Sequence, residues 1–349
     1  MFADDKICEA RMDIYDIAEK SGYSTATVSR VINKSPNVSD KARKIIEKII
    51  EESGYKPNRI ARSLAKNSTQ MIGIMVPDIR GYFESQSAYE LEKRLDKLGY
   101  TNLLCVTTDS YEKKMSYLDI LVESKVEAII GVGSTYEEKK FYEKLKNMSV
   151  IIPMALLNVK TSDENEKIVN VYIDEIEAMD QAVKLLRDNS YKKPLYVSLD
   201  TGYMSRSYIG KKSGFVEALY KYYDDANFVE FKVKNPDNDL PKLIDFLKEN
   251  PEFDSIQFEL DRLAVSAYKM MANEGIKIPE DVGIIGFDNI EATEYTNQAI
   301  TSIDQRISDQ VNFAIDNLLK ILNDEEAQTN IALEAKLIEK ETTSRDINI

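Results

Sequence analysis

The stretch IYDIAEKSGYSTATVSRVI, residues 14–32, contains two short amphipathic patterns separated by a glycine. Apolar residues recur at helical spacing in both halves: Ile14, Ile17 and Ala18, then Val28, Val31 and Ile32. Gly22 supplies the positive φ that a tight turn between two helices requires. Asp13 and Ser24 stand where N-caps are needed. The stretch therefore predicts two short helices packed on each other.

The polar side of the second predicted helix consists of Thr25, Ala26, Thr27, Ser29 and Arg30. Short side chains in the first turn would let this helix approach base edges in the major groove of DNA. We expect Thr25, Ala26 and Arg30 to read bases. The residues expected to position the phosphate backbone are Tyr15, Ser24, Ser29 and Asn33. The alternative is an ordinary surface hairpin of helices with a polar face.

A third helix begins near Ser39 and Asp40 and carries a strong apolar stripe, formed by Ile45, Ile46, Ile49 and Ile50. It would close a small three-helix headpiece over residues 12–56. Residues 57–69 then combine helix-forming residues and cations with the character of a linker.

With these segments the chain resembles the lactose and galactose repressor (LacI/GalR) family of bacterial transcription regulators. The resemblance implies that Asn58–Leu64 becomes a helix on the operator and that two such hinges enter the minor groove together. Leu64 would wedge between base steps and bend the DNA, while the small Ala61 lets the paired hinges approach. Asn58 and Arg62 belong to the same DNA-contacting segment. The alternative is that Leu64 packs beneath the body.

The charge is distributed unevenly along the chain, which carries −14 overall. Residues 12–70 hold eleven lysines and arginines and seven acids, a net +4, so the remaining residues carry −18. A basic segment of this kind suits phosphate contacts, whereas the acidic remainder should repel DNA and weaken non-specific binding.

The rest of the composition narrows the function classes. The 349 residues and 43% hydrophobic content fit a multi-domain protein. The chain has no histidine, no P-loop and no G-x-G-x-x-G motif, so we expect no enzyme activity. Cys8 and Cys105 lack metal spacing, and we expect neither metal nor cofactor. Residues 1–11 are expected to be a disordered extension rather than a secretory signal, with Met12 as an alternative start. No apolar run reaches membrane-spanning length, which favours a cytoplasmic protein.

Beyond Gln70 short apolar segments alternate with helical ones. The expected strands are Met71–Val76, Leu103–Val106, Ala128–Val132, Val150–Leu157, Val169–Ile173, Leu195–Leu199, Val229–Val233, Ile256–Leu260 and Val282–Phe287. The helices expected between them include Glu84–Leu98, Ile176–Arg187 and Leu263–Asn273. This alternation predicts two doubly wound α/β lobes of parallel sheet, like those of periplasmic binding proteins. We expect lobe 1 at about 70–173 and 301–330 and lobe 2 at about 174–300 and 331–349.

Three carboxylates follow predicted strands: Asp78, Asp261 and Asp288. Ligands of doubly wound folds bind beyond such strand ends, so we expect these residues in a cleft between the lobes. Aspartate can bind sugar hydroxyls, and Tyr82 or Phe83 suits the face of a sugar ring. Each aspartate is equally well explained as the N-cap of the following helix.

The resemblance strengthens the interpretation as a binding site. Pro279–Asp288 is close to a family signature whose last residue would face the effector. Relatives usually carry arginine where this chain has Lys211, before Gly214 and Phe215, and asparagine where it has Leu260. A lysine lacks the planar fork of arginine, for which the nearby Arg206 could compensate. The effector stays open between a sugar, a sugar phosphate, a protein corepressor and none.

The sequence therefore predicts a dimeric regulator, a repressor of carbohydrate-related genes, that binds a palindromic operator with effector-modulated affinity. The alternative is a two-lobed sugar receptor without a DNA-binding function. Deleting residues 1–69 would discriminate between the two, because a receptor would keep its whole activity.

Overall fold

The computed structural model describes residues 12–33, 35–55, 68–161, 165–202 and 204–345. It divides into two compact units, Met1–Gln70 and Met71–Ile349, here called the headpiece unit and the body. The expected extension and residues 57–67 of the expected hinge lie outside the described residues, and with them the DNA-contacting candidates Asn58, Ala61, Arg62 and Leu64.

The described part of the headpiece unit contains the three expected helices, α1 (Ile14–Ser21), α2 (Thr25–Ile32) and α3 (Asp40–Ser53). Their fully buried contacts are made by Ile17, Val28, Val31 and Ile46. The stripe on α3 centres on Ile46, because Ile45 is 37% exposed. The apolar spacing read from the sequence therefore builds one small core from three short helices.

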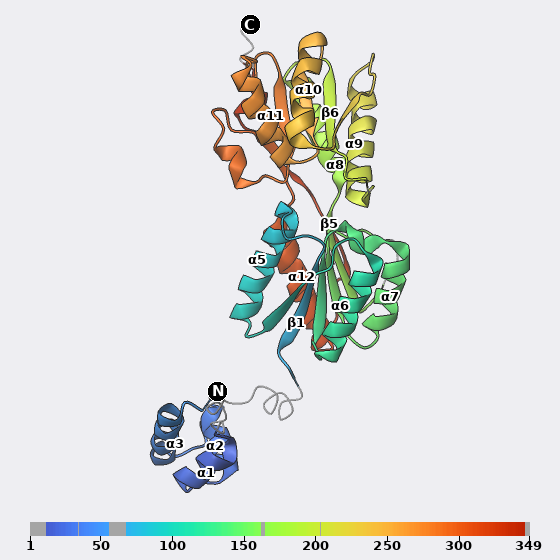
Figure 1. Cartoon of the computed structure of the whole chain (residues 1–349). Helices are drawn as coiled ribbons and strands as arrows, with labels where there is room; N and C mark the ends of the chain where they lie inside the picture. The colour runs from blue at the N-terminus through green and yellow to red at the C-terminus, as the bar shows by residue number, and fades with distance from the viewer. Residues whose placement is uncertain (1–11, 34, 56–67, 162–164, 203, 346–349) are drawn as a thin grey trace, which may run out of the picture. The chain divides into compact units, whose positions relative to one another are not determined.

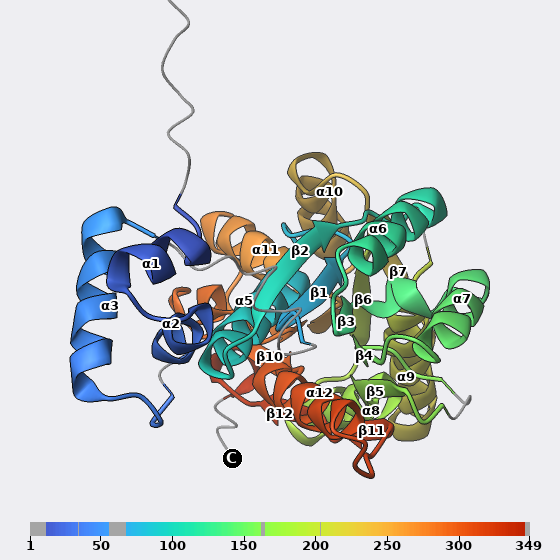
Figure 2. The same ribbon diagram turned by 90° about the horizontal axis from the view of Figure 1, so that it is seen from below.

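The first lobe of the body is built on a six-stranded sheet in which all pairings are parallel. In spatial order its strands are β11 (Asn330–Leu333), β5 (Ile168–Ile173), β4 (Met154–Leu157), β3 (Ala128–Val132), β1 (Met71–Val76) and β2 (Thr101–Val106). One face packs against α5 (Tyr82–Lys97) and α12 (Ile307–Leu322). The other packs against α6 (Tyr111–Glu123) and α7 (Lys139–Ser149) (Figures 1 and 2).

The second lobe repeats this plan. Its sheet runs β12 (Lys336–Ile338), β10 (Thr301–Asp304), β9 (Gly283–Phe287), β8 (Ser255–Phe258), β6 (Pro194–Leu199) and β7 (Glu230–Val233). Only β12 pairs antiparallel among these described strands. One face packs against α8 (Glu175–Asp188) and α9 (Arg206–Tyr222), the other against α10 (Pro236–Glu249) and α11 (Asp261–Asn273). Three short 3-10 helices, Ser134–Glu137, Glu291–Glu294 and Glu341–Thr343, complete the described body.

The chain passes between the lobes three times within the described residues: after β5, after β10 and after β11. In Figure 1 the orange-red α12 accordingly stands among the cyan and green elements of the first lobe. The expected boundaries at 301 and 331 are corrected by the strand pairing. β10 belongs to the second sheet and β11 to the first, so the later crossings follow Asp304 and Leu333.

The expected strands are all present, but their ends and number differ from the prediction. β4 begins at Met154, because Val150 and Ile151 are each 82% exposed at the end of α7. The strands β10, β11 and β12 were not predicted from the sequence. These strands are short, and none carries a continuous apolar run that would mark it in the sequence.

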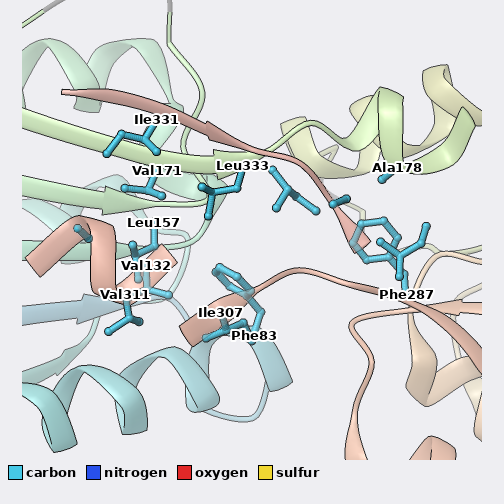
Figure 3. Close-up of a cluster of buried hydrophobic side chains, with 14 of the residues drawn as sticks. Phe83, Val132, Leu157, Val171, Ala178, Phe287, Ile307, Val311, Ile331 and Leu333 are labelled. Atoms are coloured by element: carbon cyan, nitrogen blue, oxygen red, sulfur yellow. The ribbon is translucent and has the colours of Figure 1, made fainter. Parts of the chain in front are cut away.

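One hydrophobic cluster is continuous through both lobes. It includes Phe83 and Ile307, which lie next to each other in Figure 3, and Phe287 from the second sheet. Gly214 lets α9 pack closely on α8 in the same region. A Cβ atom there would lie 2.6 Å from the Ile176 Cα atom. No described helix combines the length and the hydrophobicity needed to cross a bilayer.

Candidate DNA-reading helix and interlobe cavity

Local hydrogen bonds fix the start of α1 and the turn that leads into α2. Asp13 Oδ1 accepts from the Tyr15 and Asp16 amides at 2.7 and 3.0 Å, and the Asp16 carboxylate accepts from the Asp13 amide at 2.7 Å. Gly22 ends α1 at φ +69°, a left-handed conformation that disfavours other residues. Ser24 then caps α2 by accepting from the Thr27 amide at 3.2 Å. These contacts set the direction in which α2 leaves the turn.

The outward side of α2 contains the side chains predicted to contact DNA. Ala26 and Arg30 are exposed, whereas Thr25, Thr27 and Ser29 are partly buried. Within the described residues Arg30 makes no ion pair and no side-chain hydrogen bond, so its guanidinium is available to a ligand. Tyr15 on α1 is 71% exposed.

Three of the predicted backbone-contacting residues are engaged within the headpiece itself. The Ser24 hydroxyl lies 3.0 Å from the Thr27 hydroxyl, and the side-chain amide of Asn33 donates to Ser29 Oγ at 3.4 Å. Asn33 also forms the C-cap of α2. Short side chains at both ends of α2 therefore stabilise the helix as well as marking its polar side.

A cavity of about 570 Å³ lies between the lobes of the body. Its walls come from the carboxyl ends of parallel strands in both sheets, including those of β1, β3, β4, β6, β8 and β9. This is the position at which doubly wound folds bind ligands, and the volume suits a small molecule.

Five of the seven predicted effector-binding residues line this cavity: Asp78, Tyr82, Phe83, Lys211 and Asp288. Asp78 holds Arg80 in an ion pair at 2.6 Å, which lowers the pKa of the Asp78 carboxyl. Lys211 is 4% exposed and donates from Nζ to the Glu259 carbonyl at 3.2 Å.

Asp261 does not line the cavity. It is fully buried, and its carboxylate accepts from the Ser302 hydroxyl at 2.7 Å and from the Ile290 amide at 2.9 Å. The Asn289 amide in turn donates to Ser302 Oγ at 3.0 Å. Asp261 therefore holds the loop that follows β9 and does not form part of the cavity wall, where the sequence placed it.

Arg206 does not line the cavity either. It reaches from the second lobe to the first, where it donates to the Lys160 carbonyl at 2.7 Å and lies 3.5 Å from Glu137 Oε2. Burial raises the pKa of Glu137 to about 7. Arg206 thus connects the two lobes in this conformation. Its guanidinium does not replace, in the cavity, the planar group that Lys211 lacks.

Asp288 adopts an unusual backbone conformation beside the cavity. Its φ of +116° and the φ of +50° at Asn289 are positive, a region that non-glycine residues rarely occupy. The hydrogen bonds from the Ile290 amide to Asp261 and from the Asn289 amide to Ser302 hold this conformation in place. Backbone strain of this kind is concentrated at functional sites, which supports the cavity as a binding site.

Several cavity residues were missed by the sequence analysis: Glu84, Asn158, Glu259, Arg262 and Gln305. Asn158, Glu259 and Gln305 each follow the end of a strand. The expectation that ligands bind beyond strand ends would have identified them if the ends of the strands had been predicted correctly. Glu84 lies inside the first turn of α5 and carries no such signal.

Burial raises the pKa of the Glu84 carboxyl to about 7 and that of Asp288 to about 6. Within the described residues no three metal-ligating side chains come together as a metal site would require. The cavity therefore combines carboxyls of raised pKa with hydrogen-bonding side chains such as Asn158 and Gln305.

Comparison with known proteins places both units in one family. Residues 13–58 match the model for bacterial regulatory proteins of the lacI family. Residues 69–341 match the model for periplasmic binding proteins and the sugar-binding domain of the LacI family.

Individual relatives cover nearly the whole chain. An HTH-type transcriptional regulator from Lachnoclostridium phytofermentans is 33% identical over 95% of this chain and its own full length. The HTH-type transcriptional regulator RegA from Clostridium saccharobutylicum is 29% identical over 95% of this chain and 98% of its own.

The fold is similar to that of the Lac repressor dimer solved with operator and the anti-inducer ONPF. That chain has a TM-score of 0.83 and 21% identity, covering 95% of this chain and 99% of the other. Together with the two family matches and the 33% identical relative, the similarity shows that this chain belongs to the LacI family of bacterial transcriptional regulators.

Proposed function

We propose that this protein represses transcription by binding a palindromic operator as a homodimer, and that a small molecule in the interlobe cavity changes its DNA affinity. The observation that carries the proposal is the outward side of α2, with exposed Ala26 and unpaired Arg30. A twofold dimer would present two such helices to neighbouring major grooves.

The contacts on DNA divide by side-chain chemistry. Thr25, Ala26 and Arg30 contact base edges, whereas exposed Tyr15 and the caps of α2 position the phosphate backbone. Relatives support repression, since several similar proteins are named HTH-type transcriptional repressor PurR. A DNA-binding regulator of this kind acts in the cytoplasm.

The body would act as the sensor. A ligand that contacts both walls of the cavity favours one angle between the lobes, and it changes DNA affinity only if it binds the two arrangements differently. A structural relative, the regulator CelR, was solved as a complex with cellobiose. We therefore place carbohydrate-related genes under the control of this protein.

The experiment is selection of binding sites from randomised duplexes with the full chain at moderate salt. An inverted repeat should be enriched. Arg30→Ala should weaken binding to the selected site by about 1–3 kcal/mol and relax its sequence preference. Lys48→Ala is the matched control, because Lys48 is an exposed headpiece cation that lies on α3 and pairs with Glu52 at 3.7 Å. Absence of any enriched sequence, or an unchanged preference in Arg30→Ala, would reject the proposal.

A further inference from the structure

The interlobe cavity is lined by more acids than bases. The acids are Asp78, Glu84, Asp109, Glu259 and Asp288, and the bases are Arg80, Lys211 and Arg262. Asp78 and Arg80 neutralise each other at the rim, where Arg80 is 88% exposed.

Three of the lining carboxyls lack a directly bound cation, although the nearby charge of Lys211 lowers the pKa of each. Within the described residues Glu84, Glu259 and Asp288 form no ion pair. Glu259 and Asp288 are each 8% exposed. Glu259 Oε2 accepts from the Leu199 amide at 2.9 Å, and Asp288 Oδ1 accepts from the Gln305 side chain at 2.5 Å. The second oxygen of each carboxyl has no donor among the described residues.

Lys211 is the buried cation of this cavity, but it does not bind a carboxylate. Its Nζ donates to the Glu259 carbonyl at 3.2 Å and lies 3.8 Å from the centre of the Phe287 ring. Arg262, the other unpaired lining base, is exposed. The raised pKa values of Glu84 and Asp288 show that charge on these carboxyls is poorly stabilised without a ligand.

The chemistry of the walls selects among possible occupants. A bare metal ion does not fit, because no three ligating side chains converge within the described residues. A sugar phosphate would place its negative charge in a cavity whose acids outnumber its bases. A neutral sugar can donate hydroxyls but leaves the charge in place. An ammonium group supplies both donors and positive charge.

Building on the proposed sensor function, we propose that the interlobe cavity binds a small organic cation of amino-sugar size. Its ammonium group binds at Asp288, whose charge interacts with those of both Glu84 and Glu259. Hydroxyl groups of the ligand reach the neutral lining side chains, such as Asn158. Lys211 contributes to selection by repelling a second positive charge near Phe287.

Calorimetric titration of the full chain tests this proposal with matched ligands. Glucosamine, galactosamine and mannosamine are compared with their N-acetyl derivatives, with glucose and with glucose 6-phosphate. At least one amino sugar should bind about tenfold or more tightly than its neutral counterpart, as expected for a charge-assisted hydrogen bond. Tighter binding of a neutral or phosphorylated sugar, or no binding of any amino sugar, overturns the proposal.

A proton-linked measurement separates this mode from simple sugar binding. An ammonium group stabilises the ionised carboxylates, so binding should release protons and tighten from pH 5.5 to pH 7.0, a range in which the amine stays largely charged. Glu84→Gln should reduce both the proton release and the preference for the amine. The exposed Glu274, which pairs with Lys248 at 2.7 Å, provides the control Glu274→Gln, which should change neither.

If Glu84→Gln and the unsubstituted protein release the same number of protons on binding, the proposal is overturned. Operator selection without ligand is measured on the same preparations. If no sequence is enriched, the regulator function is rejected. If a sequence is enriched but no amino sugar binds, only the proposed class of ligand is rejected.

Discussion

The close contact of α8 and α9 leads to a quantitative prediction for Gly214→Ala. A methyl group there would lie 2.6 Å from the Ile176 Cα atom, 3.0 Å from the Ile176 carbonyl oxygen and 3.1 Å from the Glu175 carbonyl oxygen. All three are backbone atoms that cannot rotate away. Because carbon atoms normally approach to about 3.5–4.0 Å, the helices must separate by roughly 1 Å.

The expected cost follows from two opposing effects. Overpacking of this size costs about 1–3 kcal/mol, whereas replacing glycine by alanine inside a helix returns about 1 kcal/mol. The net loss is therefore up to about 2 kcal/mol. For large domains each kcal/mol corresponds to about 2–4 °C in Tm.

The matched control is Gly210→Ala, one turn earlier on the same side of α9. There the nearest atom to a Cβ is the end of the flexible Glu175 side chain, at 3.2 Å. This variant should be as stable as the parent or slightly more stable. Urea unfolding of the full chain, followed by near-ultraviolet circular dichroism, measures both variants. Equal or greater stability of Gly214→Ala would refute the packing argument.

Three further predictions concern the hinge, the buried acids and the contact between the lobes. Leu64→Ala should reduce operator bending in a gel-shift phasing assay while the headpiece stays folded. Undiminished bending would contradict the insertion of Leu64 between base steps. Burial raises the pKa of Asp261 from 3.8 to about 7, so the folded state binds the extra proton. The free energy of unfolding should therefore fall between about pH 4 and pH 7, by roughly 4 kcal/mol for this group. Asp261→Asn should flatten that decline, and stability that rises across the window would contradict the assignment. Arg206→Ala should increase the radius of gyration measured by small-angle scattering, because it removes the contacts with Lys160 and Glu137 that span the lobes; an unchanged radius would show that other contacts hold them.

The accuracy of the sequence-based predictions followed how completely each segment is buried. Met71–Val76 and Ala128–Val132 were predicted to the residue, because central parallel strands are apolar on both faces. Thr301–Asp304 was missed because its polar groups find distant partners: the Thr301 amide donates to Thr342 Oγ1, and the Thr301 hydroxyl lies 2.8 Å from the Thr343 hydroxyl. Such pairing across forty residues leaves no local pattern.

The site was partly predictable for the same reason. Strand ends located Asp78 and Asp288 correctly in the cavity walls. The same rule failed for Asp261, whose orientation is decided by Ser302 on a strand that the sequence did not reveal. Glu84 was missed because its importance arises from the approach of the two lobes, a contact between segments far apart in the chain.

The three passages of the chain between the lobes also constrain how such proteins can diversify. A gene fragment that ends between residues 174 and 333 encodes neither lobe in full, because α12 and β11 return to the first lobe. The headpiece, in contrast, is one uninterrupted stretch ahead of the body. A single join can therefore exchange the headpiece between such proteins, whereas exchange of one lobe alone requires several joins.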